Sequence, residues 1–434
     1  MALWLKTSDA DFTERFQALL SVKREQAADV NEAVAAIIAR VREEGDAALI
    51  DLTRRYDGLD VQAGTIRVGA DEIAAARNKV EPHTLDALKL AHARILDHHH
   101  RQIPSDDRYT DREGVELGLR WTAIESVGLY VPGGTASYPS SVLMNAVPAK
   151  VAGVPRVVMV VPAPKGALNP LVLVAAELAG IDEFYRVGGA QAVAALAYGT
   201  ESIAPVVKIV GPGNAYVAAA KRQVFGQVGI DMVAGPSEVV VIADAENDPA
   251  WIAADLLAQA EHDAAAQSIL ITDDANFARA VEAAVESQLA ALPRAETARA
   301  SWRDFGAAIL VRTLDEAPAL VDRLAPEHLQ IATGEPDALA ERIRNAGAIF
   351  IGRYTPEVIG DYVAGSNHVL PTARSARYAS GLSVLDFMKR TSILKLDADS
   401  LNALAPAAMA LAEAEGLEAH RRSVSIRLNP KDGA

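Results

Sequence analysis

The segment at residues 256–267, LLAQAEHDAAAQ, carries a group of polar side chains within an alanine-rich stretch of helical periodicity. Residues three or four positions apart lie on one face of a helix, so Gln259 and His262 can point at one common atom. Asp255 lies one turn earlier on the same side. The spacing therefore predicts half of a metal site with oxygen and nitrogen ligands.

Other polar residues in the second half of the chain could complete such a site. His328, His368 and His420 each stand alone among polar neighbours, and Asp361 in VIGDYVAG supplies a carboxylate in a predicted loop after a strand. Taken singly, each is more often a hydrogen-bonded structural group than a ligand. Taken together with His262, they offer ligands that suit Zn²⁺ or a similar divalent ion.

A run of three histidines at residues 98–100 follows a helical segment. Consecutive positions on a helix diverge by about 100°, so the three rings cannot converge on one metal from a regular helix. We interpret this run as a solvated helix end.

Glu327 and His328 are adjacent and follow Pro326. Proline is favoured in the first turn of a helix, so the pair is predicted to lie at a helix start facing a ligand. A carboxylate beside an imidazole offers two bases. The alternative is that Glu327 fills an N-terminal helix position and His328 only packs, and the residues alone do not separate the two interpretations.

Two glycine-containing loops, GPGN at 211–214 and GPSE at 235–238, follow or precede predicted strands. Backbone N–H groups between a strand and a helix can bind an anion or the polar edge of a nucleotide, which makes GPGN a candidate binding loop. Neither loop is the GxGxxG fingerprint, so dinucleotide binding is only weakly indicated by the glycines. The alternative for GPSE is an ordinary turn before a strand.

The elements that must position these residues follow a regular order. Helical periodicity covers residues 28–56 and 70–101, and successive units of strand, glycine turn and helix follow from the strand at AIESVGLYVPGG. EVVVIAD at 238–244 restarts the same scheme, while a helical block at 398–423 precedes the strand-like VSIRLNP. Repeated units of this kind predict parallel, doubly wound sheets.

A chain of 434 residues exceeds what one core usually supports. We predict an α/β fold of two Rossmann-like parallel-sheet domains without the usual glycine fingerprint, plus helical N-terminal and C-terminal segments. The predicted boundaries are an N-terminal helical segment at 1–27, a first α/β domain at 28–236, a second at 237–382 and a C-terminal segment at 383–434. The two similar halves suggest a duplication, although no sequence repeat demonstrates it.

Composition excludes several classes of function. The net charge of −15 repels nucleic acid and anionic membranes. The absence of cysteine excludes disulfides, thiolate metal sites and covalent thiohemiacetal chemistry. The N-terminus does not resemble a signal peptide, and proline and arginine interrupt the longest apolar runs before the ~18 residues of a membrane helix. We therefore expect a soluble, cytoplasmic protein.

Five motifs occur in order along the chain: GPGNAYVAAAKRQV, DMVAGPSEVVVIAD, LLAQAEHD, APEHLQ and EGLEAHRRSVSIRL. Together they resemble the histidinol dehydrogenase family, and the resemblance covers essentially the whole chain. It implies an NAD-dependent four-electron oxidation of L-histidinol through L-histidinal to L-histidine, in histidine biosynthesis, with one Zn²⁺ per active site. It also implies a homodimer in which the C-terminal segment of one subunit completes the active site of the other.

The resemblance assigns a role to each candidate residue. His328 would take the alcohol proton as general base, and Glu327 would activate the water that hydrates the aldehyde. The implied zinc ligands are Gln259, His262, Asp361 and His420. The implied substrate contacts are Ser237, Gln259, His262, His328, Asp361, Glu415 and His420. The implied NAD contacts are Tyr130, Gln191 and Asn214, each expected on a loop or helix start after a strand. His368 ranks below these residues.

Since the chain has no cysteine, an aldehyde cannot be trapped on a thiol and must be hydrated, which requires a positioned base. Two alternatives stay open. One is a dehydrogenase of the same fold for another small polar alcohol, such as a sulfonated diol, which would call for an added cationic residue near Glu415. The other is a non-catalytic metal-binding protein in which Glu327 and His328 only pack.

Overall fold

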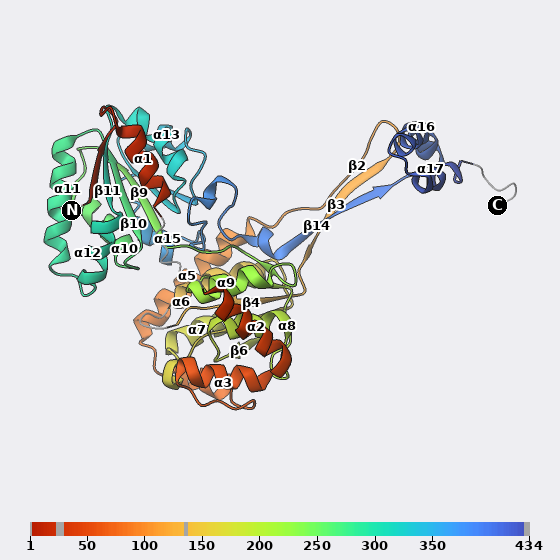
Figure 1. The fold of residues 1–434 in the computed structure, drawn as a ribbon, viewed down its shortest axis with the longest axis horizontal. Coiled ribbons are helices and arrows are strands. Elements are labelled where there is room, and N and C mark those ends of the chain that lie inside the picture. The colour runs from red at the N-terminus through yellow and green to blue at the C-terminus, as the bar shows by residue number, and fades with distance from the viewer. Residues whose placement is uncertain (1, 23–29, 134–137, 429–434) are drawn as a thin grey trace.

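The computed structural model describes residues 2–22, 30–133 and 138–428. Two α/β domains form the body of the molecule, and a narrow arm of antiparallel strands extends from it to two helices near the C-terminus (Figure 1). The predicted α/β class with two parallel sheets is confirmed.

The sheet of the first domain has five parallel strands. Their order across the sheet is β6 (Glu183–Tyr185), β5 (Arg156–Val160), β4 (Ser126–Tyr130), β7 (Lys208–Val210) and β8 (Gly229–Ile230). The central strands read as continuous apolar runs because helices cover both faces of the sheet.

The helices of the first domain form two layers. One face packs against α4 (Ala70–Arg77), α5 (Pro82–His100), α6 (Pro139–Val151) and α7 (Pro170–Leu178). The other packs against α2 (Asn31–Glu44), α3 (Asp46–Asp57), α8 (Gly189–Tyr198) and α9 (Ala215–Val224). The domain is therefore doubly wound, as predicted.

The six-stranded sheet of the second domain is also parallel. Its order is β1 (Leu3–Lys6), β11 (Ala307–Leu310), β10 (Gln267–Thr272), β9 (Glu238–Ala243), β12 (His328–Ala332) and β13 (Ala348–Ile351). Without β1, this order has the same topology as the first sheet: third, second, first, fourth and fifth strand. The shared topology supports the suggested duplication.

Two layers of helices also enclose the second sheet. One layer contains α10 (Pro249–Ala260), α11 (Ala275–Leu289) and α12 (Ala295–Phe305). The other contains α1 (Phe12–Ser21), α13 (Ala317–Leu324) and α14 (Pro336–Ala340), and the short α15 (Glu357–Tyr362) contacts α10 and β12. Asn169 and Asp248 cap α7 and α10, since their side chains accept hydrogen bonds from Leu171 N and Ala250 N at 2.8 Å.

The N-terminal segment differs from the prediction of a helical segment at 1–27. Residues 3–6 form β1, which pairs with β11 at the edge of the second sheet, and α1 packs against that sheet. A strand of four residues whose partner lies about 300 positions later in the chain has no local signal in the sequence.

The arm is a three-stranded antiparallel sheet of β2 (Asp107–Thr110), β3 (Glu116–Ala123) and β14 (Met388–Lys395), and α16 (Ala398–Ala414) and α17 (Glu418–Ser425) lie at its tip (Figure 1). The prediction of a final strand at VSIRLNP is wrong where the structure describes it, because residues up to Ser425 are helical and 426–427 form a turn. Among the described residues no strand pairs with this segment, and α17 instead packs against α16.

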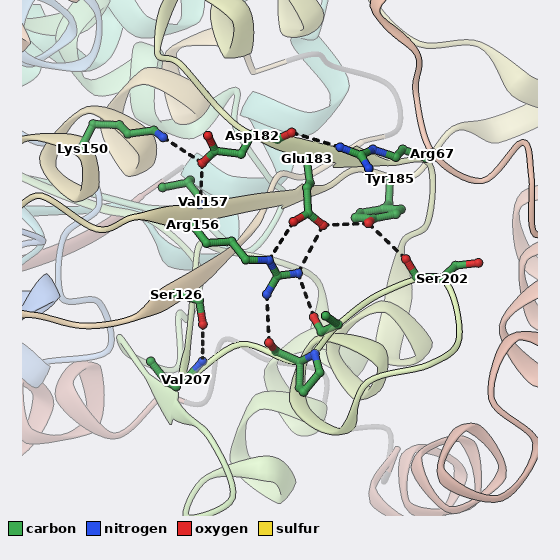
Figure 2. A network of polar contacts seen from close by, with 12 residues as sticks. Arg67, Ser126, Lys150, Arg156, Val157, Asp182, Glu183, Tyr185, Ser202 and Val207 are labelled. Atoms are coloured by element: carbon green, nitrogen blue, oxygen red, sulfur yellow. Dashed lines mark hydrogen bonds and ion pairs between the residues drawn. The ribbon is translucent and has the colours of Figure 1, made fainter.

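A polar network fixes the amino-terminal edge of the first sheet (Figure 2). Arg156 at the start of β5 donates to Glu183 Oε1 at 2.7 Å and to the carbonyl oxygens of Pro205 and Ala204. Tyr185 donates its hydroxyl proton to Glu183 Oε2 at 2.7 Å. These contacts tie β5 and β6 to the segment leading into β7, which leaves the opposite, carboxyl edge for binding loops.

Candidate active site

His328 is the first residue of β12, and Glu327 precedes it. The prediction that this pair begins a helix is wrong. Helix α13 ends at Leu324, Ala325 adopts the left-handed conformation with φ 47° and ψ 59°, and Pro326 follows. Proline is common just after a helix end because it cannot continue the helix, and here it leads into a strand. The pair therefore lies at the amino edge of the second sheet.

The hydrogen bonds of His328 define its protonation pattern. Its Nδ1 lies 3.0 Å from the backbone carbonyl oxygen of Glu238, and a carbonyl oxygen can only accept, so Nδ1 carries a proton. Its Nε2 is buried and has no hydrogen-bond partner among the described residues. In the neutral ring this nitrogen therefore has a free lone pair.

Carboxylates surround the imidazole. Glu327 Oε2 lies 3.7 Å from Nδ1 of His328, and Asp361 Oδ1 lies 3.7 Å from Nε2. The backbone N–H of Glu238 donates to Glu327 Oε2 at 3.0 Å, so the GPSE loop holds both members of the pair. As predicted, this loop is followed directly by a strand, β9.

Burial and nearby charges together raise the pKa of both Glu327 and His328. Burial raises the pKa of Glu327 to about 7. Burial alone would lower the pKa of His328, but the nearby carboxylates of Glu327, Glu357 and Asp361 outweigh this effect and raise it. The surroundings thus favour the imidazolium form that results when His328 accepts a proton.

Gln259 lies in the last turn of α10, and His262 lies in the turn that follows rather than on the helix itself. The backbone N–H of His262 donates to the carbonyl oxygen of Gln259 at 3.2 Å. Gln259 is fully buried, yet neither atom of its side-chain amide has a partner among the described residues. An amide that is buried without partners costs free energy, which indicates that a ligand pairs with it.

Asp361 lies on the short helix α15. The prediction that it lies in a loop is therefore wrong. Burial opposes its ionisation, but the imidazoles of His328, His368 and His262 lie near enough to lower its pKa. His368 also contacts Asp361 directly, since its Nδ1 donates to the backbone carbonyl oxygen of Asp361 at 3.0 Å.

Across the described ranges, no three His, Asp or Glu side chains gather closely enough to hold a metal ion. His262 and Asp361 supply only two donors of these types, and Gln259 supplies an amide. Because all available donors are nitrogen or oxygen and the Gln259 amide lacks a partner, the residues fit a divalent ion that still needs a donor from elsewhere.

Glu415 and His420 are exposed residues at the tip of the arm, on the C-cap of α16 and on α17. Figure 1 shows these helices at the far end of the arm from α15. One chain therefore brings together Gln259, His262, Glu327, His328 and Asp361, but not Glu415 and His420. Ser237 lies in the GPSE loop, directly before β9.

The three predicted NAD contacts lie at the carboxyl edge of the first sheet. Tyr130 is the last residue of β4 rather than a loop residue, and its hydroxyl oxygen accepts a hydrogen bond from Gly189 N at 3.0 Å. Gln191 is buried in the first turn of α8. Asn214 caps α9, and its side-chain oxygen accepts from Tyr216 N at 3.1 Å and from Val217 N at 3.2 Å.

A buried ion pair that we did not anticipate fixes the GPGN loop. Lys221 on α9 contacts Asp231, and the two side chains are only 3% and 1% exposed. Lys221 Nζ donates to Gly211 O at 2.9 Å, while Gly211 N donates to Asp231 Oδ2 at 2.8 Å. A Cβ on Gly211 would come within 2.1 Å of the backbone oxygen of Tyr130, so this loop presses against the end of β4.

The histidine run at 98–100 is part of α5, and its interpretation as a solvated helix end is wrong for one member. His98 and His100 are exposed, but His99 is fully buried. Its Nδ1 donates to Ile95 O at 2.7 Å, and Asn367 Nδ2 lies 3.3 Å from its Nε2. His99 is thus a structural residue that packs against the segment carrying His368.

Comparisons with known proteins agree over nearly the whole chain. The family model described as histidinol dehydrogenase matches residues 20–428. Histidinol dehydrogenase from Mesorhizobium japonicum is 68% identical over 429 residues, which cover 99% of this chain and 100% of that protein. Histidinol dehydrogenase from Rhizobium meliloti is 69% identical over 429 residues and 99% of both chains. The chain belongs to the histidinol dehydrogenase family.

A solved member of the histidinol dehydrogenase family has the same fold. The crystal structure of histidinol dehydrogenase from Elizabethkingia anophelis is 36% identical, with a TM-score of 0.94 over 98% of each chain. The resemblance drawn from the five motifs is confirmed, and the chain is an NAD-dependent oxidoreductase of histidine biosynthesis. No helix in the described part of the chain has the length and apolar character needed to span a membrane.

Proposed function

We propose that the chain oxidises L-histidinol to L-histidine in two hydride transfers at one site, with His328 as general base. The observation that carries this assignment is the buried Nε2 of His328, which has no partner among the described residues while Nδ1 is fixed by the Glu238 carbonyl. A base needs a free lone pair at a defined position, and the neutral ring of His328 has one at this nitrogen.

In the first step, His328 Nε2 takes the hydroxyl proton of the alcohol while the carbinol C–H bond delivers a hydride to NAD⁺, which gives the aldehyde and NADH. The carboxylates of Glu327, Glu357 and Asp361 stabilise the resulting imidazolium. They act in a buried site, where charge interactions are stronger than in water.

In the second step, water adds to the aldehyde carbon, and the hydrate loses a proton and a second hydride to a second NAD⁺. Glu327 is suited to accept the proton from the attacking water because burial raises its pKa to about 7. Its position is fixed, since Glu327 Oε2 accepts the N–H of Glu238 at 3.0 Å. The chain has no cysteine, so this route replaces a thiohemiacetal.

Gln259, His262 and Asp361 would hold a zinc ion, together with His420 of the partner subunit. A bound zinc ion would supply positive charge that orients a nitrogen ligand of the substrate and polarises its oxygen. The support from this chain is the unpartnered amide of Gln259 and the proximity of His262 to Asp361.

Tyr130, Gln191 and Asn214 are the proposed NAD contacts. They lie at the end of β4, after β6 and after β7, at the carboxyl edge where nucleotides bind in doubly wound sheets. Gly213 and Asn214, between β7 and α9, and Ala215 at the start of α9 carry backbone N–H groups that can donate to phosphate oxygens.

We further propose a homodimer in the cytoplasm. The arm tip exposes apolar side chains on α16 and at both ends of α17: Leu404 and Leu411 lie on α16, Leu417 lies in the turn before α17, and Ile426 lies just beyond it. The surface around α15 exposes Trp251, Tyr354, Ile359 and Tyr362. Exposed apolar patches of this kind mark interaction sites, and joining them across two copies would bring Glu415 and His420 of the partner subunit to the site.

The catalytic pair can be tested by single substitutions, with histidinol and histidinal offered separately. His328→Asn should nearly abolish both oxidations, whereas Glu327→Gln should reduce histidinal oxidation more than histidinol oxidation. General bases contribute about 10²–10⁴-fold. His83→Asn, at an exposed residue of α5, is the matched control and should retain parental rates. Parental activity in either site variant would refute the assigned role.

A further inference from the structure

Glu357 is a buried carboxyl group that the steps above do not need as an acid or a base. It is the first residue of α15 and is only 2% exposed. Neither of its oxygens has a hydrogen-bond partner among the described residues. An unpaired buried carboxyl group destabilises a fold, so its presence indicates a role in a site rather than in the core.

The neighbours of Glu357 show which way it faces. Burial raises the pKa of Glu357 to about 8, and the charges of His328 and Asp255 also act on it. Asp255 lies on α10 four residues before Gln259, so the two share one face of the helix. Helix α15 contacts α10 and β12, and Asp255 on α10 lies near enough for its charge to act on Glu357.

Unpartnered polar atoms are concentrated around this contact. They are Gln259 Nε2 and Oε1, Gln330 Oε1, His328 Nε2 and both carboxyl oxygens of Glu357. Gln330 already donates its amide hydrogen to Asp255 Oδ2 at 2.7 Å. Gln259 Nε2 is therefore the amide donor of this group that has no acceptor among the described residues. The carboxylate of Glu357 is an acceptor that can carry a negative charge.

We propose that Glu357 is a positioning residue for the metal: its carboxylate accepts a hydrogen bond from Gln259 Nε2 and thereby turns Gln259 Oε1 toward the ion. An amide that binds a cation through oxygen leaves its NH₂ group to be satisfied, and a carboxylate is a strong acceptor for it. The inference rests on the proposed zinc site. Groups that orient metal ligands in this way typically change metal affinity 10–100-fold.

The test measures metal affinity and stability separately. Zn²⁺ would be titrated against a chromogenic chelator for the parent, Glu357→Gln, Glu357→Leu and Gln259→Leu, and Co²⁺ would be substituted to record the visible absorption of the ligand field. Glu282→Gln on α11 is the matched control, because Glu282 Oε1 is also buried and unpartnered among the described residues.

We expect Glu357→Leu to bind Zn²⁺ 10–100-fold more weakly than the parent and to alter the Co²⁺ spectrum. Glu357→Gln, which keeps an acceptor but loses the charge, should lie between the two, and Glu282→Gln should match the parent. The metal-free Glu357→Leu protein should unfold at the same temperature as the parent or higher, since an unpaired buried carboxyl group is replaced by an apolar side chain. A group with only a structural role would instead lower that temperature.

Parental Zn²⁺ affinity and Co²⁺ spectrum in both Glu357 variants, with affinity lost in Gln259→Leu, would overturn the inference and leave the zinc site intact. Parental affinity in Gln259→Leu itself would overturn the zinc site and the inference together. If Glu357→Leu does not fold, the comparison of Glu357→Gln with Glu282→Gln decides the question.

Discussion

Replacing Lys221 by methionine should weaken NAD binding from a position beneath the GPGN loop. The Lys221 and Asp231 side chains are 3% and 1% exposed, and the pair holds the backbone of Gly211 at both its N–H and its carbonyl oxygen. In Lys221→Met, the Asp231 carboxylate loses its cationic partner and keeps, among the residues that the structure describes, the Gly211 N–H. Breaking a buried pair by removing one member costs about 3–5 kcal/mol.

The double variant Lys221→Met/Asp231→Asn provides the internal control. It removes both charges and keeps an oxygen that can accept the Gly211 N–H, so its cost should be smaller, about 1–2 kcal/mol for the lost hydrogen bond to Gly211 O. If half of the roughly 3–5 kcal/mol lost in Lys221→Met appears as weaker binding of NAD, the affinity for NAD falls by about tenfold or more, since 1.4 kcal/mol corresponds to tenfold.

The assay combines hydrogen exchange of residues 208–224 with equilibrium NAD binding. Lys221→Met should exchange faster in β7 and the start of α9 and bind NAD more weakly, while L-histidinol binding stays at the parental level. Parental exchange and parental NAD affinity in the single variant would refute the reasoning that this pair positions the loop.

Three further outcomes follow from the structure. Burial raises the pKa of Asp255 from 3.8 to about 6. The folded protein therefore holds this proton more tightly than the unfolded chain, and the free energy of unfolding falls as the pH rises from about 4 to 6. In urea denaturation at each pH, the metal-free Asp255→Asn protein should lose about 2–3 kcal/mol less over this range than the parent. Asn214→Ala should cost about 1 kcal/mol through loss of the α9 cap and should also raise the KM for NAD; an unchanged KM would remove Asn214 from the NAD site. Leu411→Asp, at a residue 66% exposed on α16, should shift the protein from dimer to monomer in light scattering and abolish oxidation while NAD still binds, whereas an active monomer would contradict the shared site.

The sheets could be predicted because buried parallel strands read as uninterrupted apolar runs separated by glycine turns. The runs at β4, β5 and β9 show this directly. By contrast, β1 and the end of α17 depend on distant neighbours: β1 exists because β11 offers an edge, and 424–425 are helical because α16 offers a packing surface.

The structure brings together five of the residues that the sequence suggested for the site, but the local conformations around them differ from those predicted. The left-handed conformation of Ala325 ends α13 before Pro326, and an alanine gives no local signal for it. His262 and His328 lie before β10 and at the start of β12, at the amino edge of the second sheet, while strand patterns direct attention to carboxyl edges.

The contacts of Lys221 and Glu357 are tertiary. Lys221 on α9 meets Asp231 just after β8, and Glu357 lies on α15, which contacts α10 and β12, elements that are distant from it in the chain. Charged residues are mostly exposed, so the sequence alone gives no reason to bury these three.

The most direct test of the account is the number of NADH molecules formed for each L-histidinol consumed, measured by absorbance with the zinc-loaded protein and again after chelation. The account predicts two NADH per substrate, a loss of activity on chelation and recovery on addition of Zn²⁺. One NADH per substrate, or activity that persists without metal, would contradict the four-electron reaction at a metal-dependent site.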